Sequence, residues 1–352
     1  MHTHRPLPRT QRGFTLAELM IAVTLGLMIL AGMTTLFVNN SRAQGEIEKA
    51  NRQVENGRFA VALMSGDLRN AGFYGEFDPA PLLTPAALPD PCGLSLAELK
   101  AALPLHLQGV DNVAVAGAPG CIADVRAGTD VLVVRHTRTC VAGDSNCEPA
   151  SAGGPFFQAS LCNNPSELDS GDVNDHYALG LTTAVLTRHK RDCDQSAGSG
   201  TLAPIRVYET HIYFVADNDR AGDGIPTLKR AELGIVGGAV RMTVVPLVEG
   251  IENLQVEYGV DTSGDGVADV YVANPGAAAG CAVPACVAGN WRNTMAVKLF
   301  ILARNLEPSQ GYTDTKSYQL GANTVAAAGD RYKRHVFQAV VNLPNPAGRK
   351  LP

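Results

Sequence analysis

A nearly continuous apolar run over residues 14–38 constrains this chain most. At ~1.5 Å rise per residue, a helix of this length crosses the hydrocarbon core of a bilayer, which is ~30 Å thick. The leader before the run carries three arginines and no acidic residue, and it ends at Gly13. The run itself contains one acid, Glu18, near its start. Because an ionised carboxylate inside a membrane is costly, Glu18 needs a partner there.

Two simpler interpretations of this segment compete. A secretory signal peptide has an apolar core of about 7–15 residues and small residues before its cleavage site, whereas this run is longer and has its acid near the start. A plain single-span anchor explains the length and the basic flank. It leaves Glu18 unexplained, and we therefore disfavour both interpretations.

The spacing of Gly13, Phe14 and Glu18 resembles the prepilin leader and methylation segment of type IV pilins and type II secretion pseudopilins. The resemblance implies that a membrane peptidase cleaves after Gly13 and methylates the new N-terminus at Phe14. It also implies that Glu18 pairs with the terminal amine of a neighbouring subunit in a filament. Removing one partner of a buried ion pair costs about 3–5 kcal/mol.

The composition is that of a folded protein with an acidic exterior. The chain has 352 residues, of which 45% are apolar and 18% charged, so a packed core is expected. The formal net charge of −5 becomes −8 when residues 1–13 and their three arginines are removed. This charge disfavours binding to a nucleic-acid backbone.

All eight cysteines follow the apolar run, which indicates disulfides formed in an oxidising compartment. Cys281 with Cys286, and Cys140 with Cys147, each enclose a short loop and are candidates for local bridges. Eight cysteines allow roughly a hundred connectivities, so the spacing alone fixes none of them. Zinc is disfavoured because no CxxC pair or Cys/His cluster is present. Adding Cys92–Cys121 and Cys162–Cys193 would give four bridges in which no disulfide loop encloses another.

The helical pattern continues past the apolar run to Gly72, as two series of small and apolar residues seven apart. Such a stripe could pack against a coiled-coil partner or against the protein's own sheet. We favour the sheet because small residues fill half of the stripe. The expected organisation is a leader (1–13), a transmembrane helix (14–38), a periplasmic continuation of the helix (39–73) and a β-rich head (74–352). The two series are Ile47, Val54, Val61, Leu68 and Ala50, Gly57, Met64, Ala71.

Strand patterns dominate the rest of the chain, separated by turns rich in Asp, Gly and Pro. Residues 75–130 are expected to form loops with one short helix near Leu96–Leu103. Several of the later strands alternate apolar and polar residues, as half-buried antiparallel strands do. One long helix followed by strands predicts an α+β, pilin-like fold with the helix on an antiparallel sheet. The expected strands are 129–136, 205–216, 239–248, 252–261, 295–304 and 335–343.

Four C-terminal segments resemble the PilW-type minor pilin family, whereas residues 75–200 resemble nothing we can name. The family resemblance implies a subunit of the inner membrane with a periplasmic head, reaching the cell surface after assembly. It implies a role in priming the type IV pilus or at its tip, with other minor pilins, the major pilin, the prepilin peptidase and the assembly platform as partners. The EGIENLQVEYGVD part of the second segment (249–261) also resembles J-type pseudopilins of type II secretion, which remain the alternative. The segments are DGIPTLKRAEL (223–233), VVPLVEGIENLQVEYGVDTSGDGVADVYV (244–272), MAVKLFILARN (295–305) and HVFQAVVNLPN (335–345).

The segment DTSGDGVAD imitates the opening of a Ca²⁺-binding loop. Asp261, Ser263, Asp265 and Asp269 supply oxygen side chains at positions 1, 3, 5 and 9. Position 12 is Val272, so the bidentate glutamate of an EF-hand is missing. Ca²⁺ and a plain turn between strands both remain open, and we favour the turn on the missing ligand.

No catalytic constellation is apparent in the sequence. The chain contains no GxSxG, HExxH, phosphate-binding loop or dinucleotide fingerprint, and its eight histidines are scattered. We therefore expect no enzymatic activity and no cofactor beyond the Ca²⁺ considered above. A membrane-anchored periplasmic enzyme is the third class of function, and no site supports it.

The first prediction concerns processing. The mature protein should begin at N-methylated Phe14, because Gly13 joins a basic leader to an apolar helix as in prepilins. Mass spectrometry of the N-terminal peptide, from protein purified out of its native membrane, measures this. A chain that begins at Met1, or after Ala31, would contradict the pilin resemblance.

Overall fold

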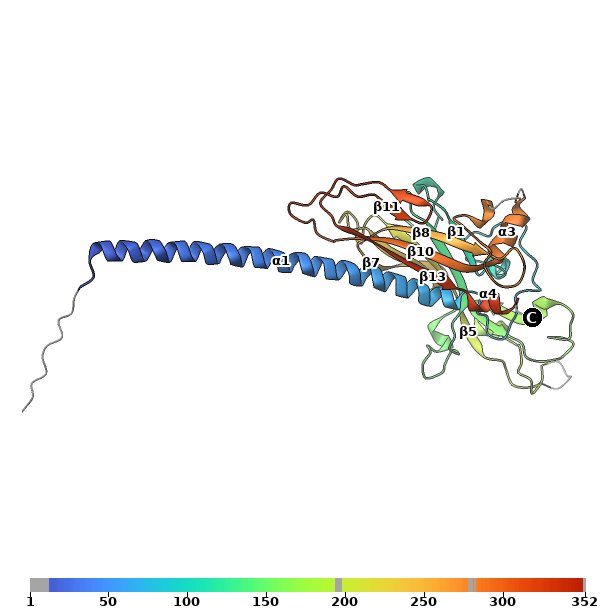
Figure 1. Ribbon diagram of the computed structural model, residues 1–352. Helices are drawn as coiled ribbons and strands as arrows, with labels where there is room; N and C mark the ends of the chain where they lie inside the picture. Colours follow the sequence, from blue (N-terminus) through green and yellow to red (C-terminus); the bar gives the residue numbers. More distant parts are fainter. Residues whose placement is uncertain (1–12, 194–197, 278–280, 282, 351–352) are drawn as a thin grey trace, which may run out of the picture. The chain divides into compact units, whose positions relative to one another are not determined.

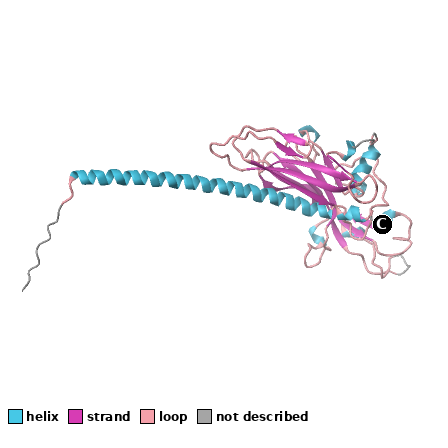
Figure 2. Cartoon of the chain, viewed as in Figure 1, coloured by secondary structure: helices cyan, strands magenta, loops and turns pink. Residues whose placement is uncertain are grey.

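The computed structural model describes residues 13–193, 198–277, 281 and 283–350. One continuous helix, α1 (Leu16–Asn70), precedes a head built mainly of antiparallel strands (Figures 1 and 2). The chain divides into two compact units, of which the second begins at Arg52. The second half of α1 is thus part of the compact head.

The ends of α1 follow from local residue chemistry. The helix was expected over residues 14–72 and is observed over Leu16–Asn70. Beyond its last turn, Gly72 adopts a φ of +73°, which glycine reaches without steric cost. The N–H of Gly72 donates to the carbonyl of Arg135 at 2.9 Å, so the chain leaves the helix bonded to the sheet.

One face of α1 forms the centre of the main hydrophobic core, which confirms that the helix packs on the protein's own sheets. Met64 and Leu68 are fully buried there among residues of both large sheets. The buried positions follow steps of three and four, so the expected seven-residue series is only partly buried. Ile47 is exposed. The buried residues are Gln53, Gly57, Ala60, Met64, Leu68 and Ala71.

The larger sheet has seven strands, and the long strand β5 is its hub. Successive parts of β5 pair antiparallel with β2, β3 and β6. Further out, β1 pairs with β2, β4 with β3 and β7 with β6. The bounds are β1 (Leu107–Val110), β2 (Val131–Thr137), β3 (Phe156–Ala159), β4 (Tyr177–Gly180), β5 (Ile205–Ala216), β6 (Thr227–Val236) and β7 (Ala239–Glu249).

The second sheet has four strands in the order β13–β10–β8–β9. Strand β10 pairs with β8 on one side and β13 on the other. The separate hairpin β11–β12 contributes to a small apolar cluster with β10. Asp130, just before β2, ties the two sheets together, since its N–H donates to the Leu254 carbonyl at 2.9 Å. The bounds are β8 (Ile251–Val260), β9 (Val270–Val272), β10 (Thr294–Arg304), β11 (Tyr318–Leu320), β12 (Asn323–Val325) and β13 (Arg334–Asn342).

Three short helices complete the head. Helix α2 (Leu96–Ala102) lies where a short helix was expected, and Ser95 with Glu98 forms its capping box. Helix α3 (Pro284–Arg292) begins within the Cys281–Cys286 loop and contains Cys286, and α4 (Pro344–Gly348) follows β13. Both begin with proline, whose fixed φ suits the first helical turn.

Residues 75–200 hold three strands that were not expected, of which only β1 lies in the part expected to form loops, residues 75–130. They contain β1, β3 and β4, three strands of four residues each whose short apolar pattern is too brief to read as strands. They also cover the larger sheet: Val113, Ile122 and Val125 pack on the face opposite α1. Strand β2 is consequently buried on both faces rather than half-buried.

The six expected strands are all present, at β2, β5, β7, β8, β10 and β13. Strand β6 is the longest one missed, since its sequence TLKRAELGIV places three charges in the middle of the strand. The three-residue strands β9, β11 and β12 were also missed, because they pair only locally and carry no period of their own.

Two glycines of α1 give a matched test of the helix–sheet seam. A Cβ at Gly57 would lie 2.1 Å from the ring of Phe337, whereas a Cβ at Gly66 meets nothing within 4 Å. Gly66→Ala should raise the free energy of unfolding by about 0.5–1 kcal/mol through helix propensity. Gly57→Ala gains the same propensity but overpacks the seam, which costs about 1–3 kcal/mol.

Urea unfolding measures the difference in free energy of unfolding between the two alanine variants. The gain in helix propensity is common to both and cancels in this difference. We expect Gly57→Ala to be the less stable of the two by about 1–3 kcal/mol. Equal stabilities would contradict the packing of α1 against β13.

Candidate functional site

The residues expected to act in processing and assembly lie at the start of α1. Residues 1–12 of the expected leader lie outside the described part of the chain, and Gly13 and Phe14 precede the first turn. The Thr15 hydroxyl accepts the Glu18 N–H at 3.2 Å. Glu18 Oε2 accepts the Thr15 N–H at 2.9 Å and its hydroxyl at 2.8 Å. Together these bonds form a capping box.

Thr15 is a residue that the sequence reasoning missed. Its spacing to Glu18, Thr-x-x-Glu ahead of an apolar run, is the known signature of a capping box and could have found it. The helix dipole also favours a negative charge in the first turn. Glu18 therefore has a defined position at the helix start within one subunit.

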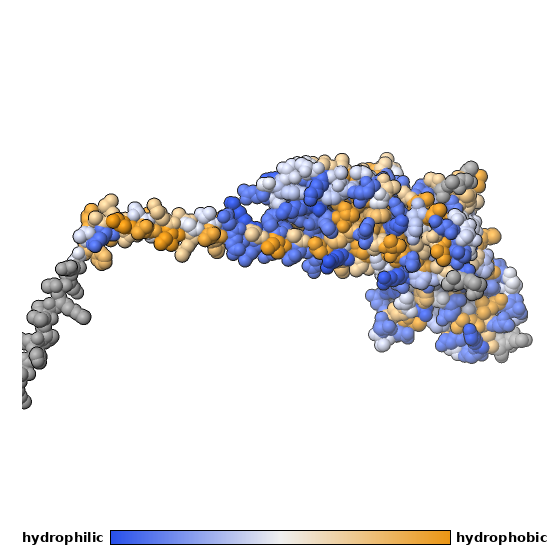
Figure 3. All heavy atoms as spheres, viewed as in Figure 1, coloured by the Kyte–Doolittle hydropathy of each residue, from blue (hydrophilic) through white to orange (hydrophobic). Residues whose placement is uncertain are grey.

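From Leu19 to Val38 the helix carries apolar and small side chains and three threonines, and no charged residue (Figure 3). An 18-residue stretch of α1 has a mean hydropathy of 2.2 and none of it is buried by the protein. Phe14 is 89% exposed. By length and composition this helix can cross a membrane.

A buried polar cluster lies further along α1, where Asp67 meets strands β2 and β5. His136 Nε2 lies 2.7 Å from Asp67 Oδ1, and His211 Nδ1 lies 2.9 Å from Asp67 Oδ2. The Tyr213 hydroxyl donates to Oδ2 at 2.9 Å and itself accepts from Arg230 at 3.2 Å. The Asp67 side chain is only 8% exposed. One helix residue is thereby bonded to three side chains of the sheet.

The charges of this cluster follow from its hydrogen bonds. His136 faces acceptors with both ring nitrogens, since Nδ1 lies 3.0 Å from the Thr137 carbonyl, so it must carry two protons. Burial opposes that charge, but Asp67 and Glu209 outweigh it and raise the pKa of His136. Burial also opposes ionisation of Asp67, yet the bonds from His136 and His211 lower its pKa. The pair is thus an ion pair at neutral pH.

Among the residues that the structure describes, Asp67, His136 and His211 form the one group whose possible metal-ligating atoms lie together, within 4.8 Å of one another. Their direct separations of 2.7–3.0 Å are hydrogen-bond distances. The three side chains therefore bond to each other, and we interpret the cluster as the polar joint between α1 and the larger sheet.

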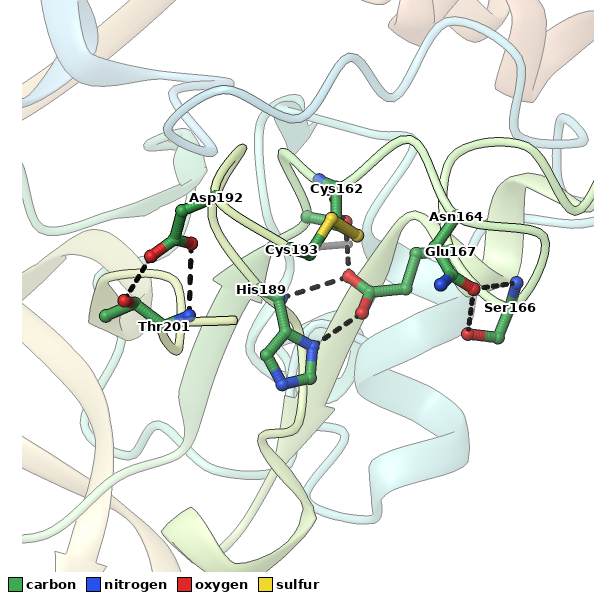
Figure 4. The surroundings of a disulfide bond; sticks show 9 residues. Cys162, Asn164, Ser166, Glu167, His189, Asp192, Cys193 and Thr201 are labelled. Carbon is green, nitrogen blue, oxygen red and sulfur yellow. Dashed lines mark hydrogen bonds and ion pairs between the residues drawn. A yellow bond between two sulfur atoms is a disulfide. The ribbon is translucent and has the colours of Figure 1, made fainter. Parts of the chain in front are cut away.

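The eight cysteines form four disulfides, which are the two local bridges and the two longer ones considered from the sequence. Cys162–Cys193 lies beside the buried Glu167 (Figure 4). Glu167 accepts from Ser160 at 2.5 Å and lies 2.7 Å from His189 Nδ1. Burial would raise the pKa of Glu167, but these bonds lower it. The full set is Cys92–Cys121, Cys140–Cys147, Cys162–Cys193 and Cys281–Cys286.

The DTSGDGVAD segment joins β8 to β9, and its acids bond to the loop itself. Asp261 accepts from the N–H groups of Gly264 and Gly266 and from Lys350 Nζ, at 2.6–2.9 Å. Asp269 Oδ2 accepts from the backbones of residues 262 and 263, and Asp265 from residue 267. These are the contacts of a tight turn. Ser263 donates to Asp261 at 3.3 Å, so all four candidate ligands have a partner within the turn or in Lys350.

Comparison with known families completes the description of the site. The family model described as prokaryotic N-terminal methylation motif matches residues 8–34, which include Gly13, Phe14 and Glu18. The model described as type IV pilus-assembly protein W matches residues 212–345, which run from β5 to α4. Together, the two matches support a PilW-type minor pilin. The pilin is thus a structural subunit of the type IV pilus system, with a membrane-anchoring helix and a β-rich head.

Other comparisons add little to this identification. No protein with curated annotation matches the pilin significantly. A type IV-like pilin from Thermus thermophilus is 14% identical, with a TM-score of 0.26 over 62% of this chain and 80% of that one. At that score the similarity carries no argument about the pilin.

The Asp67 cluster yields a prediction about the head. Asp67→Asn should lower the free energy of unfolding by about 3–5 kcal/mol, because it removes the nearest counter-ion of the buried His136. Glu55→Gln, an exposed change of the same kind on the same helix, should be neutral within about 0.5 kcal/mol. Urea unfolding of the full pilin in detergent measures both changes. Equal effects of the two substitutions would show that the Asp67 cluster does not stabilise the head.

The same ion pair predicts how stability depends on pH. Asp67, whose pKa is lowered on folding, stabilises above its unfolded pKa of ~3.9, and this contribution is lost as the pH falls. His136, whose pKa is raised, stabilises fully below ~6.5, and its contribution is lost as the pH rises through the raised value. The pair should therefore contribute most between about pH 4 and 6.5.

Urea midpoints measured from acid to alkaline pH test this dependence, with Asp67→Asn as the comparison. Glu209, Arg138 and Arg230 face the same cluster and remain in the variant. The decline above neutral pH should be present in the wild type and reduced in Asp67→Asn. Parallel curves for the two proteins would show that other groups cause the decline.

Proposed function

We propose that this pilin acts in the priming of type IV pilus assembly, in an initiation complex that ends at the pilus tip. It is cleaved by the prepilin peptidase, held in the inner membrane with its head in the periplasm, and carried to the cell surface with the filament. Its partners are the other minor pilins, the major pilin and the assembly platform. Its role is mechanical rather than enzymatic.

Three features support this placement. The arginines of the leader precede the apolar helix, and basic flanks stay on the cytoplasmic side, which directs the head outward. Four disulfides in the head fit an oxidising compartment. The described residues bury none of the most apolar stretch of α1, as expected for a helix that moves from lipid to helix contacts.

Glu18 is the observation that carries the proposal. It is the one acid in the apolar run, and among the residues described in the subunit Thr15 alone bonds to it. Cleavage after Gly13 would create a new amine at Phe14, one residue before Thr15. Two oppositely charged groups would then lie at the membrane-facing start of neighbouring subunits, where pairing removes both unpaired charges.

The fifth prediction tests this role. Glu18→Ala should insert normally, because the apolar run keeps its length, but its amount in sheared pili should fall about tenfold or more, since each loss of ~1.4 kcal/mol is tenfold in an equilibrium. Glu48→Ala, an exposed acid of the same helix outside the apolar run, should behave as wild type. Immunoblots of membranes and sheared pili from cells lacking the chromosomal copy measure both fractions.

Thr15→Ala separates pairing between subunits from capping within one. If Glu18 acts only as a cap, Thr15→Ala should reproduce the full defect; we expect a smaller one. Wild-type recovery of Glu18→Ala in pili would refute the assembly role. Normal piliation with lost secretion of exoproteins would favour the pseudopilin alternative.

A further inference from the structure

A cavity of about 340 Å³ lies in the head where α3, α4 and the segments around residues 79–84 and 104–106 meet. Its volume is at the lower end of small-molecule sites, roughly 300–1,000 Å³. Much of the wall is apolar or small, with a few polar side chains at defined points. The apolar or small lining residues are Pro79, Ala80, Pro104, Gly289, Met295 and Pro346.

Three cationic side chains line this cavity, Arg292, Arg349 and Lys350, and none of the described residues places a carboxylate in its wall. Two acids lie behind the cations: Asp78 is 3.3 Å from Arg349 Nε, and Asp261 is 2.9 Å from Lys350 Nζ. Among the described residues the local balance is therefore one positive charge in excess. The cavity is thus positive on a chain whose net charge is −5.

Arg292 supplies the excess charge. Its guanidinium donates to the carbonyls of Leu82, Pro79 and Ala80 and to the Thr84 hydroxyl, so it is held rigidly by neutral groups. Within the described chain no acidic group lies within ion-pair distance of it, and burial lowers its pKa. A fixed, partly buried cation of this kind favours an anion from outside.

The other cations keep donors for a ligand. Arg349 uses Nη2 for the carbonyls of Gly72 and Phe77. Its Nη1 donates to no acceptor in the described part of the chain. Lys350 Nζ donates to Asp261 and Asn293, which leaves its third N–H. Several charged donors that converge on one cavity match the geometry of oxyanion recognition.

His106 lies in the wall of the cavity, and the three cations affect its pKa. It is buried, and Nε2 lies 2.7 Å from the Thr294 carbonyl, so this nitrogen carries the proton. Burial lowers the pKa of His106 to about 4, and Arg349, Arg292 and Lys350 act in the same direction. His106 is therefore neutral at physiological pH, and the positive charge of the cavity comes from the three permanent cations.

We propose that this cavity binds the carboxylate or phosphate group of a small anionic ligand, with Arg349 and Lys350 as the groups that contact the oxyanion and Arg292 as the fixed charge behind them. The volume accommodates a ligand of about the size of a sugar acid. The site is separate from α1 and from Glu18, so it stands independently of the assembly role.

Calorimetric titration of the full pilin in detergent tests the site, with glucuronate, glucose and inorganic phosphate as probes. Glucuronate should bind saturably and glucose at least about tenfold more weakly, because charged hydrogen bonds are lost with the carboxylate. Affinity should fall as salt is added. Phosphate binding alone would assign the cavity to a bare oxyanion, whereas glucuronate binding alone would assign it to a carboxylated ligand; both outcomes support an oxyanion site.

Matched variants locate the binding. Lys350→Gln should weaken it about tenfold, while Lys350→Arg keeps the charge and most of the affinity. Arg241→Gln removes an exposed cation on β7, outside the cavity, and should bind as wild type. Thermal melts of each variant report whether it is folded, and the wild-type titrations decide the question by themselves if Lys350→Gln does not fold. No saturable binding by the wild type, equal binding of glucose, or equal loss in Arg241→Gln would overturn the proposal.

Discussion

The contact of the second half of α1 with both sheets is the constraint on which the rest of the head depends. Residues from Gln53 to Ala71 bury one face among β1, β2, β5, β8 and β10, so neither sheet has a complete core without the helix. Small residues such as Gly57 allow the close approach, with the ring of Phe337 lying where a side chain would be. Asp67 makes this apolar contact specific. Its ion pair and hydrogen bonds fix one register of α1 on the larger sheet, whereas apolar packing alone would tolerate several.

Two acids of α1 illustrate how position decides chemistry on a single helix. Glu18 lies in an exposed apolar segment, where Thr15 is its hydrogen-bond partner among the described residues. Asp67 lies in the buried seam, where His136, His211 and Tyr213 saturate both of its oxygens. The first is suited to assembly between subunits and the second to holding the helix on the head.

The segment before β5 has a role that complements the helix. It covers the face of the larger sheet opposite α1, and Cys92–Cys121 lies against this layer. Cys140–Cys147 and Cys162–Cys193 close further loops of the same segment. Such loops have little periodic structure to hold them, and cross-links reduce the entropy that they gain on unfolding. The cationic cavity forms at the other end of the chain, where α4 and Lys350 return to the start of the head.

The elements with a strong local signal could be predicted from the sequence. The apolar run, the Gly13–Glu18 spacing, the long helix and six of the seven longer strands follow from length, period and local spacing. The four-residue strands were beyond prediction because their pairing partners, not their own residues, make them strands. The Asp67 cluster joins residues up to 146 positions apart, and no period or motif links Asp67 to Tyr213. The cavity likewise assembles residues 79–106 with 289–350. Only the tertiary structure decided these sites, because burial and partnership between charges depend on which distant segments the fold places together.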